Sequence, residues 1–210
     1  MRKYNTRYLI PFLIVFLCIC FQSCTTLQQI GEALMNLKRL QFKLGGVTNF
    51  RLAGIYINQV SSLSDLSPGD GIKLFNAFRK KAFPAEFVIE VLALNPNDGT
   101  GGSQKTVSTL SSLESRLLID GEPTVIGNID RPIEIPGTGQ ASVIPIRMTI
   151  DLYEFFGNKG YEEIIRLALA MGGKQGSTSR ISLDALPRVS TPYGEIEYPG
   201  RITIIDKEFR

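Results

Sequence analysis

The chain has 210 residues, 43% of them hydrophobic, with 23 basic and 20 acidic side chains and a formal net charge of +3. Three of the basic residues fall within the first seven positions, so the rest of the chain is formally neutral and gives no electrostatic argument for nucleic-acid binding. The chain contains no histidine, which excludes serine–histidine and cysteine–histidine catalysis, histidine metal ligands and imidazole acid–base chemistry.

The first 23 residues have the layout of a signal peptide. Arg2, Lys3 and Arg7 form a basic start, and an apolar stretch follows over residues 8–21, interrupted by Pro11. This stretch is shorter than the roughly 20 apolar residues that a membrane-spanning helix needs, and polar residues follow it. A cleaved export signal is therefore favoured over an uncleaved anchor helix.

Residues 21–24, Phe-Gln-Ser-Cys, resemble the lipobox of bacterial lipoproteins, with Phe21 in place of the usual leucine. The resemblance implies cleavage between Ser23 and Cys24, a diacylglycerol thioether on Cys24, and often a further acyl chain, such as palmitate, on the new amino group. Two or three acyl chains attach a protein stably to a membrane. By the sorting rule of Gram-negative lipoproteins, Thr25 favours the outer membrane, with the protein facing the periplasm.

The other two cysteines, Cys18 and Cys20, belong to the signal, so the exported chain keeps only Cys24. It has no disulfide framework and no zinc-binding pattern, and we expect no metal and no cofactor. The 187 residues that remain after residue 23 are enough to bury a hydrophobic core. We expect one domain over residues 47–210, preceded by a lipidated tether over residues 24–46.

Three helices are predicted from apolar spacing of three and four residues. The first, over residues 26–41, is interpreted as a tether helix packed on its own domain, with an interfacial or partner-binding helix as the alternative. The second begins at Ser67 and Pro68 and runs to residue 82; the third spans residues 158–171 and ends at a glycine pair. The apolar positions of the three are Leu27, Ile30, Leu34 and Leu37; Leu74, Phe75, Phe78 and Ala82; and Tyr161, Ile164, Ile165, Ala168 and Leu169. The basic run Arg79-Lys80-Lys81 is interpreted as a solvated helix face.

Short strands separated by glycine and proline account for most of the remainder. The clearest alternation places Ile144, Ile146, Met148, Ile150 and Leu152 on one face. The predicted strands are residues 48–57, 85–94, 113–119, 125–126, 132–135, 143–152, 180–189 and 194–205. This pattern indicates a mainly β protein, a sandwich or barrel, rather than alternating β–α units.

Several of the turn motifs occur in an order that resembles the type 2 late embryogenesis abundant family, also described through its water stress and hypersensitive response domain. The resemblance covers roughly residues 47–205 and rests on the order and spacing of the motifs. It is carried by Asn95, Pro96, Asn97, Asp120, Gly121, Gly127, Pro136, Pro145, Pro192 and Gly194. The resemblance implies an antiparallel immunoglobulin- or fibronectin III-like β-sandwich with accessory helices, a role in stress tolerance, and no catalytic residues.

Three further segments resemble known catalytic or ligand-binding patterns in part. Glu162-Glu163 make a poor carboxylate pair on a helix, and Glu195 and Glu197 are better explained as a solvated strand face than as a glycosidase pair. Residues 99–106 lack the glycine that a phosphate loop places before Lys105, so they are interpreted as a flexible hairpin loop. The oxygen-rich segment 95–98 lacks the spaced carboxylates of a calcium loop and is interpreted as a turn.

Two functions follow as hypotheses. The first is a lipid-anchored, non-enzymatic binding or stress-protective module of the cell envelope, acting on an apolar ligand or on a membrane surface. The alternative is a structural or accessory subunit of an envelope transport or surface assembly, docking through the stripe from Leu27 to Leu37 or through strand addition at a sheet edge.

Overall fold

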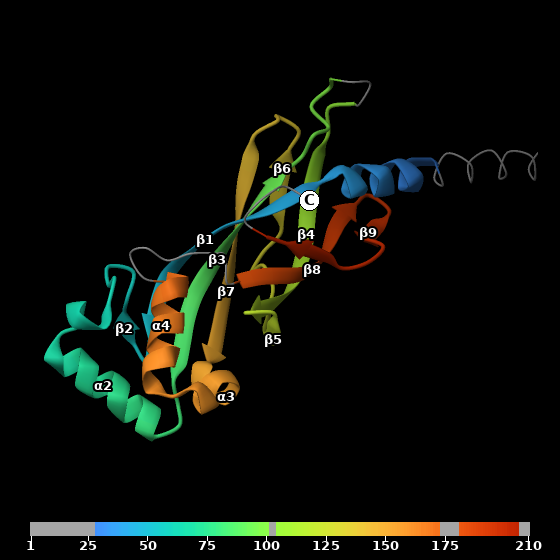
Figure 1. The fold of residues 1–210 in the computed structure, drawn as a ribbon. Coiled ribbons are helices and arrows are strands. Elements are labelled where there is room, and N and C mark those ends of the chain that lie inside the picture. The colour runs from blue at the N-terminus through green and yellow to red at the C-terminus, as the bar shows by residue number, and fades with distance from the viewer. Residues whose placement is uncertain (1–27, 101–103, 173–180, 206–210) are drawn as a thin grey trace, which may run out of the picture.

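A computed structural model describes residues 28–100, 104–172 and 181–205. The predicted signal segment, Ser23 and Cys24 lie outside these residues. The protein is mainly antiparallel β structure with a few helices, arranged as two sheets (Figure 1). The four-stranded sheet has the order β2-β1-β3-β7, with β1 (Gln41–Leu52), β2 (Ile55–Tyr56), β3 (Pro84–Leu94) and β7 (Ala141–Asp151).

The second sheet has six strands. Its main path is β10-β8-β4-β5, while β6 pairs with β4 and β9 pairs with β8. Its strands are β4 (Val107–Ile119), β5 (Glu122–Gly127), β6 (Ile133–Pro136), β8 (Ile181–Thr191), β9 (Gly194–Glu197) and β10 (Ile202–Ile204). The two sheets approach each other at one edge. There the Leu44 N–H of β1 donates to the carbonyl of Ile205, which directly follows β10, at 2.8 Å.

Alternating side chains of both sheets form one shared core. In β7 the side chains of Ile144, Ile146, Met148 and Ile150 are buried, which confirms the predicted alternation. The strand ends at Asp151, whose carboxylate accepts hydrogen bonds from the Tyr153 N–H and the Phe83 N–H. Leu152, predicted as the last strand residue, is instead the first residue of a short helix.

The helices are α2 (Pro68–Arg79), α3 (Leu152–Phe156) and α4 (Tyr161–Gly172), with short 3-10 turns at η1 (Leu63–Asp65) and η2 (Gly157–Lys159). The predicted helix over 158–171 starts later, since Gly160 at φ +84° separates η2 from α4. Its buried positions Ile164, Ile165 and Ala168 are confirmed. The Ser67 hydroxyl caps α2 by accepting from the Asp70 N–H at 3.1 Å, as expected.

The apolar face predicted for α2 is partly wrong. Leu74 is fully buried and Phe78 is half-buried, but Phe75 is 47% exposed and Ala82 is exposed. At 100° per residue, Phe75 lies on the side of the helix that carries Ile72 and Arg79 rather than directly above Leu74. Phe75 therefore faces outward.

The N-terminal helix, described over residues 28–39, lies at the end of the molecule opposite α2 (Figure 1). Leu37 is buried in the core and Leu34 is half-buried, whereas Ile30 is 36% exposed. Leu27, the first position of the predicted stripe, lies outside the described residues. Among the described positions, those nearest the sheet pack on the domain. β1 begins at Gln41, so residues 41–46, expected in the tether, pair with β3 in the four-stranded sheet.

Two loops test the turn predictions. Asp120 and Gly121, two of the turn-motif residues named from the sequence, have φ of +53° and +84° and join β4 to β5, as expected for a strand connection. Residues 99–106 do not close a hairpin, because β3 and β4 belong to different sheets. The chain between β3 and β4 therefore connects the two sheets.

Candidate binding site on the four-stranded sheet

The Asn95-Pro96-Asn97 motif forms a buried hydrogen-bonded node. Both asparagine side chains are 0% exposed. The Asn95 amide nitrogen donates to the carbonyls of Thr106 and Ile135, at 3.0 and 2.9 Å, and its oxygen accepts from the Asn97 N–H and side-chain amide. The predicted turn is present as an Asx turn, and it joins the ends of β3, β4 and β6.

Pro136, at the end of β6, brings Gly137 against this node. A Cβ on Gly137 would lie 2.0 Å from the Asn97 carbonyl oxygen, so no larger side chain fits in this position. On the outer side, the Arg39 guanidinium donates to the Asn97 side-chain oxygen at 3.2 Å and connects the N-terminal helix to the node. Because the asparagines are enclosed and bonded to protein groups, the node holds the fold together rather than binding a ligand.

The remaining motif residues do not converge on one place. Gly127, at the end of β5, lies where a Cβ would meet the Met148 side chain at 2.9 Å. Pro145 is exposed in the edge strand β7, opposite Glu90. Pro192 and Gly194 form the β8–β9 turn, where the Thr191 hydroxyl donates to the Gly194 carbonyl at 2.7 Å. The motif therefore describes turns and close packing, not a binding site.

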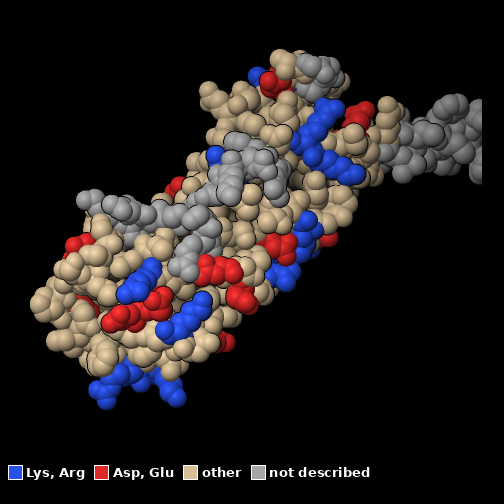
Figure 2. All heavy atoms as spheres, in the orientation of Figure 1, with Lys and Arg blue, Asp and Glu red and all other residues tan. Residues whose placement is uncertain are grey.

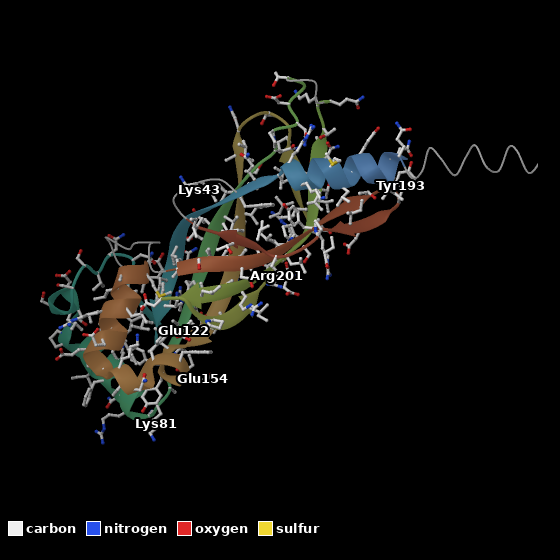
Figure 3. The ribbon with its side chains drawn as sticks, turned by 45° about the vertical axis from the view of Figure 1, so that its right-hand side comes forward. Lys43, Lys81, Glu122, Glu154, Tyr193 and Arg201 are labelled. Carbon is white, nitrogen blue, oxygen red and sulfur yellow. The ribbon has the colours of Figure 1, made fainter. Side chains whose placement is uncertain are left out.

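That β8–β9 turn also contacts the N-terminal helix. The Tyr193 hydroxyl donates to the Gln29 side-chain oxygen, and Figure 3 shows Tyr193 beside this helix. The turn and the Arg39–Asn97 bond are two polar links between the helix and the rest of the domain.

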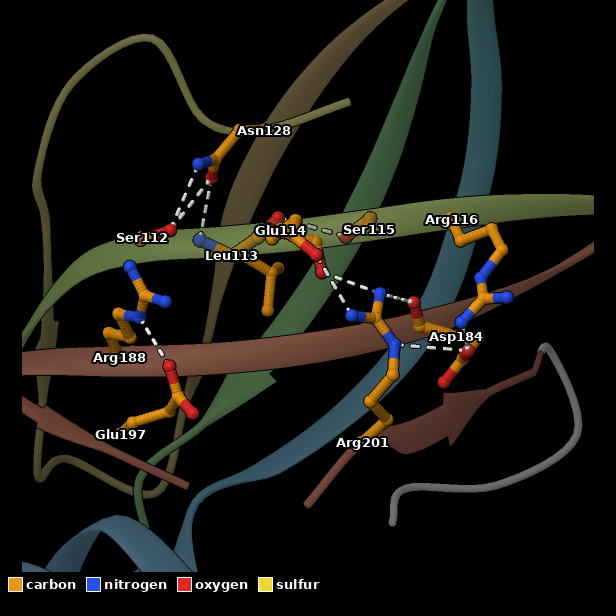
Figure 4. A network of polar contacts seen from close by, with 10 residues as sticks. All are labelled: Ser112, Leu113, Glu114, Ser115, Arg116, Asn128, Asp184, Arg188, Glu197 and Arg201. Carbon is orange, nitrogen blue, oxygen red and sulfur yellow. Dashed lines mark hydrogen bonds and ion pairs between the residues drawn. The ribbon is translucent and has the colours of Figure 1, made fainter. Parts of the chain in front are cut away.

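An ionic network lies on the outer face of the six-stranded sheet (Figure 4). Arg201 contacts the Glu114 carboxylate at 2.8 Å and the Asp184 carboxylate at 3.0 Å, and Arg116 also reaches Asp184 at 2.9 Å. The hydrogen bond from Arg201 lowers the pKa of Glu114, and in return Glu114 raises the pKa of Arg201. Each of these carboxylates is therefore neutralised within the protein.

Three of the four carboxylates in the pairs considered from the sequence, Glu162, Glu163 and Glu197, are neutralised in the same way. Glu197 is held by Arg188 at 2.6 Å, and this contact raises the pKa of Arg188. Glu162 and Glu163 both pair with Arg166, at 3.6 and 2.8 Å. The four acidic side chains lie on exposed faces of β9 and α4 and do not face one another across a cleft.

The oxygen-rich segment 95–98 ends in a local turn. The Asp98 carboxylate accepts from the hydroxyl and the N–H of Thr100, at 2.6 and 2.9 Å, and the hydroxyl bond is the main cause of its lowered pKa. In the described ranges, no group of three or more cysteine or acidic side chains could hold a metal ion.

A hollow of about 320 Å³ opens on the outer face of the four-stranded sheet, where β1, β2, β3 and β7 meet. The strand register brings its lining residues together. Arg51 is opposite Glu86, and Glu86 is opposite Thr149. Arg147 lies two residues along β7 on the same face, opposite Val88. The lining residues are Asn49, Arg51, Tyr56, Glu86, Phe87, Val88, Arg147 and Thr149.

The hollow holds two guanidinium groups that have no ion-pair partner among the described residues. The Arg51 guanidinium carbon lies 5.9 Å from the centre of the Tyr56 ring, and the Tyr56 hydroxyl donates to the Asn49 side-chain oxygen at 3.1 Å. Within the part of the chain that the structure describes, neither Arg51 nor Arg147 has an ion pair within 4.0 Å. With Glu86 as the acidic member, the lining carries a net charge of +1.

This arrangement suits an anionic group, because guanidinium donors bind carboxylates and phosphates in a fixed, forked geometry. Val88 and the Tyr56 ring add apolar surface to the same wall. The sequence prediction missed the site, since the residues come from four strands. The alternation of side chains within β1, β3 and β7 can be read from the sequence. The register that places these strands beside one another cannot.

Fold and site together describe a mainly antiparallel β protein with a small, polar hollow on one sheet. No protein-family model matches the chain, and no curated protein matches it. A solution structure described as a late embryogenesis abundant (LEA) protein aligns with 92% of this chain and 88% of its own length, at 11% identity and a TM-score of 0.33. A likeness at this level gives no basis for transferring a function.

The described residues include no helix that is long and apolar enough to cross a membrane.

Proposed function

We propose that the protein is a lipid-anchored, non-enzymatic binding module of the bacterial envelope, whose ligand presents an anionic group to Arg51 and Arg147. The observation that carries the binding role is the hollow on the four-stranded sheet, whose two guanidinium groups form no ion pair with any residue that the structure describes. On the six-stranded sheet, by contrast, Arg116, Arg188 and Arg201 all have carboxylate partners.

The anchoring part of the proposal rests on the lipobox-like residues 21–24. Cys24 would carry the lipid after cleavage at Ser23, and Thr25 would direct the protein to the outer membrane, facing the periplasm. A stress-protective role remains part of the proposal and rests on the order of the turn motifs. The order of these motifs and the hollow are independent observations.

Mass spectrometry of molecules that co-purify with the membrane form tests the binding role. We expect an acidic molecule to be enriched with the wild-type protein and lost when Arg51→Met and Arg147→Met are combined. The matched control is Arg116→Met with Arg188→Met on the other sheet, which removes the same charge and should leave the enrichment unchanged. Equal enrichment with all three proteins would refute the assignment of the hollow.

A search for turnover tests the non-enzymatic part separately. Incubating the purified protein with panels of ester, glycoside, peptide and phosphate substrates should yield no product above that of the Arg51→Met, Arg147→Met variant. Turnover that depends on the folded protein would contradict the proposal even if the anchor and the ligand were as described.

One observation favours the second candidate, an accessory subunit of an envelope assembly. On the N-terminal helix, Met35 is 55% exposed and Ile30 is 36% exposed, so part of the apolar surface is open to a partner helix. Cross-linking in cells from a photoreactive residue at Met35 should recover one specific envelope protein if this function holds. A photoreactive residue at exposed Asn76 is the control. If the Met35 probe recovers no protein beyond those that the Asn76 probe recovers, the accessory-subunit function is excluded.

A further inference from the structure

The outward side of α2 carries two large apolar side chains. Ile72 is 63% exposed and Phe75 is 47% exposed, while Leu74 between them is fully buried. Ile72, Phe75 and Arg79 are three or four residues apart, so they follow one another along the same face of the helix. A helix covering the end of a domain ordinarily presents polar residues on this side.

Aromatic contacts hold this face in place. Phe75 meets Tyr161 of α4 edge-on, with ring centroids 5.6 Å apart. Behind it, Phe78 contacts Tyr161 and Tyr153 at 5.6 and 5.2 Å and buried Phe83 at 6.4 Å. Partial burial raises the pKa of Tyr161. The exposed ring of Phe75 therefore packs on Tyr161 at the edge of an aromatic cluster and lies outside the core.

Three adjacent basic residues lie where the helix ends: Arg79 is its last residue, Lys80 is its C-cap and Lys81 follows. All three are exposed. Figure 3 shows Lys81 at the tip of the molecule, and Figure 2 shows basic side chains gathered at the same tip. The nearest acidic group on the helix, Asp70, lies in its first turn and pairs with Lys73 at 3.6 Å. The three basic residues thus form a positive surface next to the exposed apolar residues.

We propose that these five residues, Ile72, Phe75, Arg79, Lys80 and Lys81, form a surface that docks on an anionic phospholipid membrane. Exposed aliphatic and aromatic side chains enter the boundary between headgroups and acyl chains, and neighbouring cations bind the phosphate groups. This docking surface lies at the opposite end of the molecule from the N-terminal helix (Figure 1). It is separate from attachment through Cys24 and does not depend on it.

A chain that starts at Thr25 tests docking without the lipid or the signal segment. All the buried apolar residues that the structure describes lie between Leu37 and Ile204, so this chain keeps the described core. The protein contains no tryptophan, and Phe75→Trp therefore gives a single fluorescent probe. With phosphatidylcholine–phosphatidylglycerol vesicles, we expect a blue shift in its emission and sedimentation with the vesicles. Neither is expected with pure phosphatidylcholine.

The controls separate a docking surface from general charge attraction. Reversing Arg79, Lys80 and Lys81 together to Glu should weaken vesicle binding by about tenfold or more. Reversing exposed Lys38, Lys105 and Arg131 to Glu changes the net charge equally and should have less than half that effect on the logarithm of the affinity. Circular dichroism establishes that each variant is folded.

Three results would overturn the proposal: no binding to anionic vesicles, equal losses from the two triple variants, or an unshifted emission from the bound Phe75→Trp protein. The first would mean that the basic residues form a solvated helix face, as the sequence suggests. A Val143→Trp protein, probed on exposed β7 of the four-stranded sheet, should bind with an unchanged emission maximum.

Discussion

Asn95 shows how one buried side chain can connect three strand ends. Its amide donates to the carbonyls of Thr106 and Ile135, and its oxygen accepts two bonds from Asn97. Removing such a side chain leaves buried polar groups without partners, and each loss costs about 1–3 kcal/mol. At this scale the motif residues stabilise the fold and do not form a ligand site.

Asn95→Ala should therefore lower the free energy of unfolding by about 3 kcal/mol or more. Urea denaturation followed by circular dichroism measures the change. Asn76→Ala, at an exposed position of α2, is the control and should change stability by less than about 0.5 kcal/mol. A similar small effect of both substitutions would show that the node does not stabilise the fold.

The pKa of Glu114 leads to a prediction about acid stability. The hydrogen bond from Arg201 lowers the pKa of this carboxyl below its ordinary value of 4.5 in the folded protein. Its contribution to stability is therefore complete above the unfolded-state pKa and is lost as the pH falls through the lower, folded-state pKa. Glu114 is partly exposed, so the contribution is modest.

Glu114→Gln should make the free energy of unfolding less dependent on pH below about 4.5. The difference in this free energy between the variant and the wild type should therefore be smaller at pH 3 than at pH 7. Parallel urea titrations between pH 3 and pH 7 provide the comparison. Glu122→Gln, at an exposed carboxyl for which the structure gives no ion pair among the described residues, is the matched control. If Glu114→Gln and Glu122→Gln flatten the profile equally, Arg201 does not hold the Glu114 carboxylate.

At the scale of elements, α4 approaches β1 closely where the helix ends. A Cβ on Gly172 would lie 2.2 Å from the ring of Phe50, which itself stacks on Phe87 at 5.0 Å. Gly71 in α2 has no atom within 4 Å of the corresponding position. A substitution at Gly172 therefore tests the packing of α4 on β1, whereas a substitution at Gly71 tests helix propensity.

Gly172→Ala should lower stability by about 1–3 kcal/mol, because α4 or Phe50 must move. Gly71→Ala should instead raise stability by up to about 1 kcal/mol, because alanine favours a helix interior. Thermal unfolding of the two variants provides the measurement. Stabilisation by both substitutions would mean that α4 does not pack on β1 as described.

The helices and strands differ in how far the sequence predicts them. Ser67 and Pro68 mark the start of α2 because a helix cap is a local signal, and the alternation in β7 follows from burial of one face. The outward turn of Phe75 was missed because an apolar residue on α2 gives no sign of which neighbours cover it. The sequence predicts a hairpin after Asn97 where the structure has a crossover, because the sheet to which a strand belongs depends on distant strands.

The candidate site shows the same limit more strongly. Arg51, Glu86 and Arg147 are ordinary exposed positions of three strands, and only the register of β1, β3 and β7 places them together. The motif residues, in contrast, were recognisable because turn chemistry is local. Local signals thus located the turns of this protein, while the hollow depended on long-range pairing.

At the scale of the whole molecule, three features lie on different parts of one domain. The N-terminal helix lies at one end, the docking surface of α2 at the other (Figure 1), and the hollow on the four-stranded sheet. The proposed lipid on Cys24 would hold the N-terminal end of the molecule at a membrane. If the N-terminal end is anchored, the docking surface of α2 at the opposite end points away from that membrane and is available to a second, facing anionic membrane.

The intact mass of protein extracted from membranes of a Gram-negative host tests this anchor most directly, with Cys24→Ser as the control. The account predicts a chain that begins at Cys24 and carries the added mass of a diacylglycerol group, with or without a further acyl chain. The Cys24→Ser protein should lack this mass. A wild-type chain that still begins at Met1, or that begins at Cys24 without added lipid, would contradict the account.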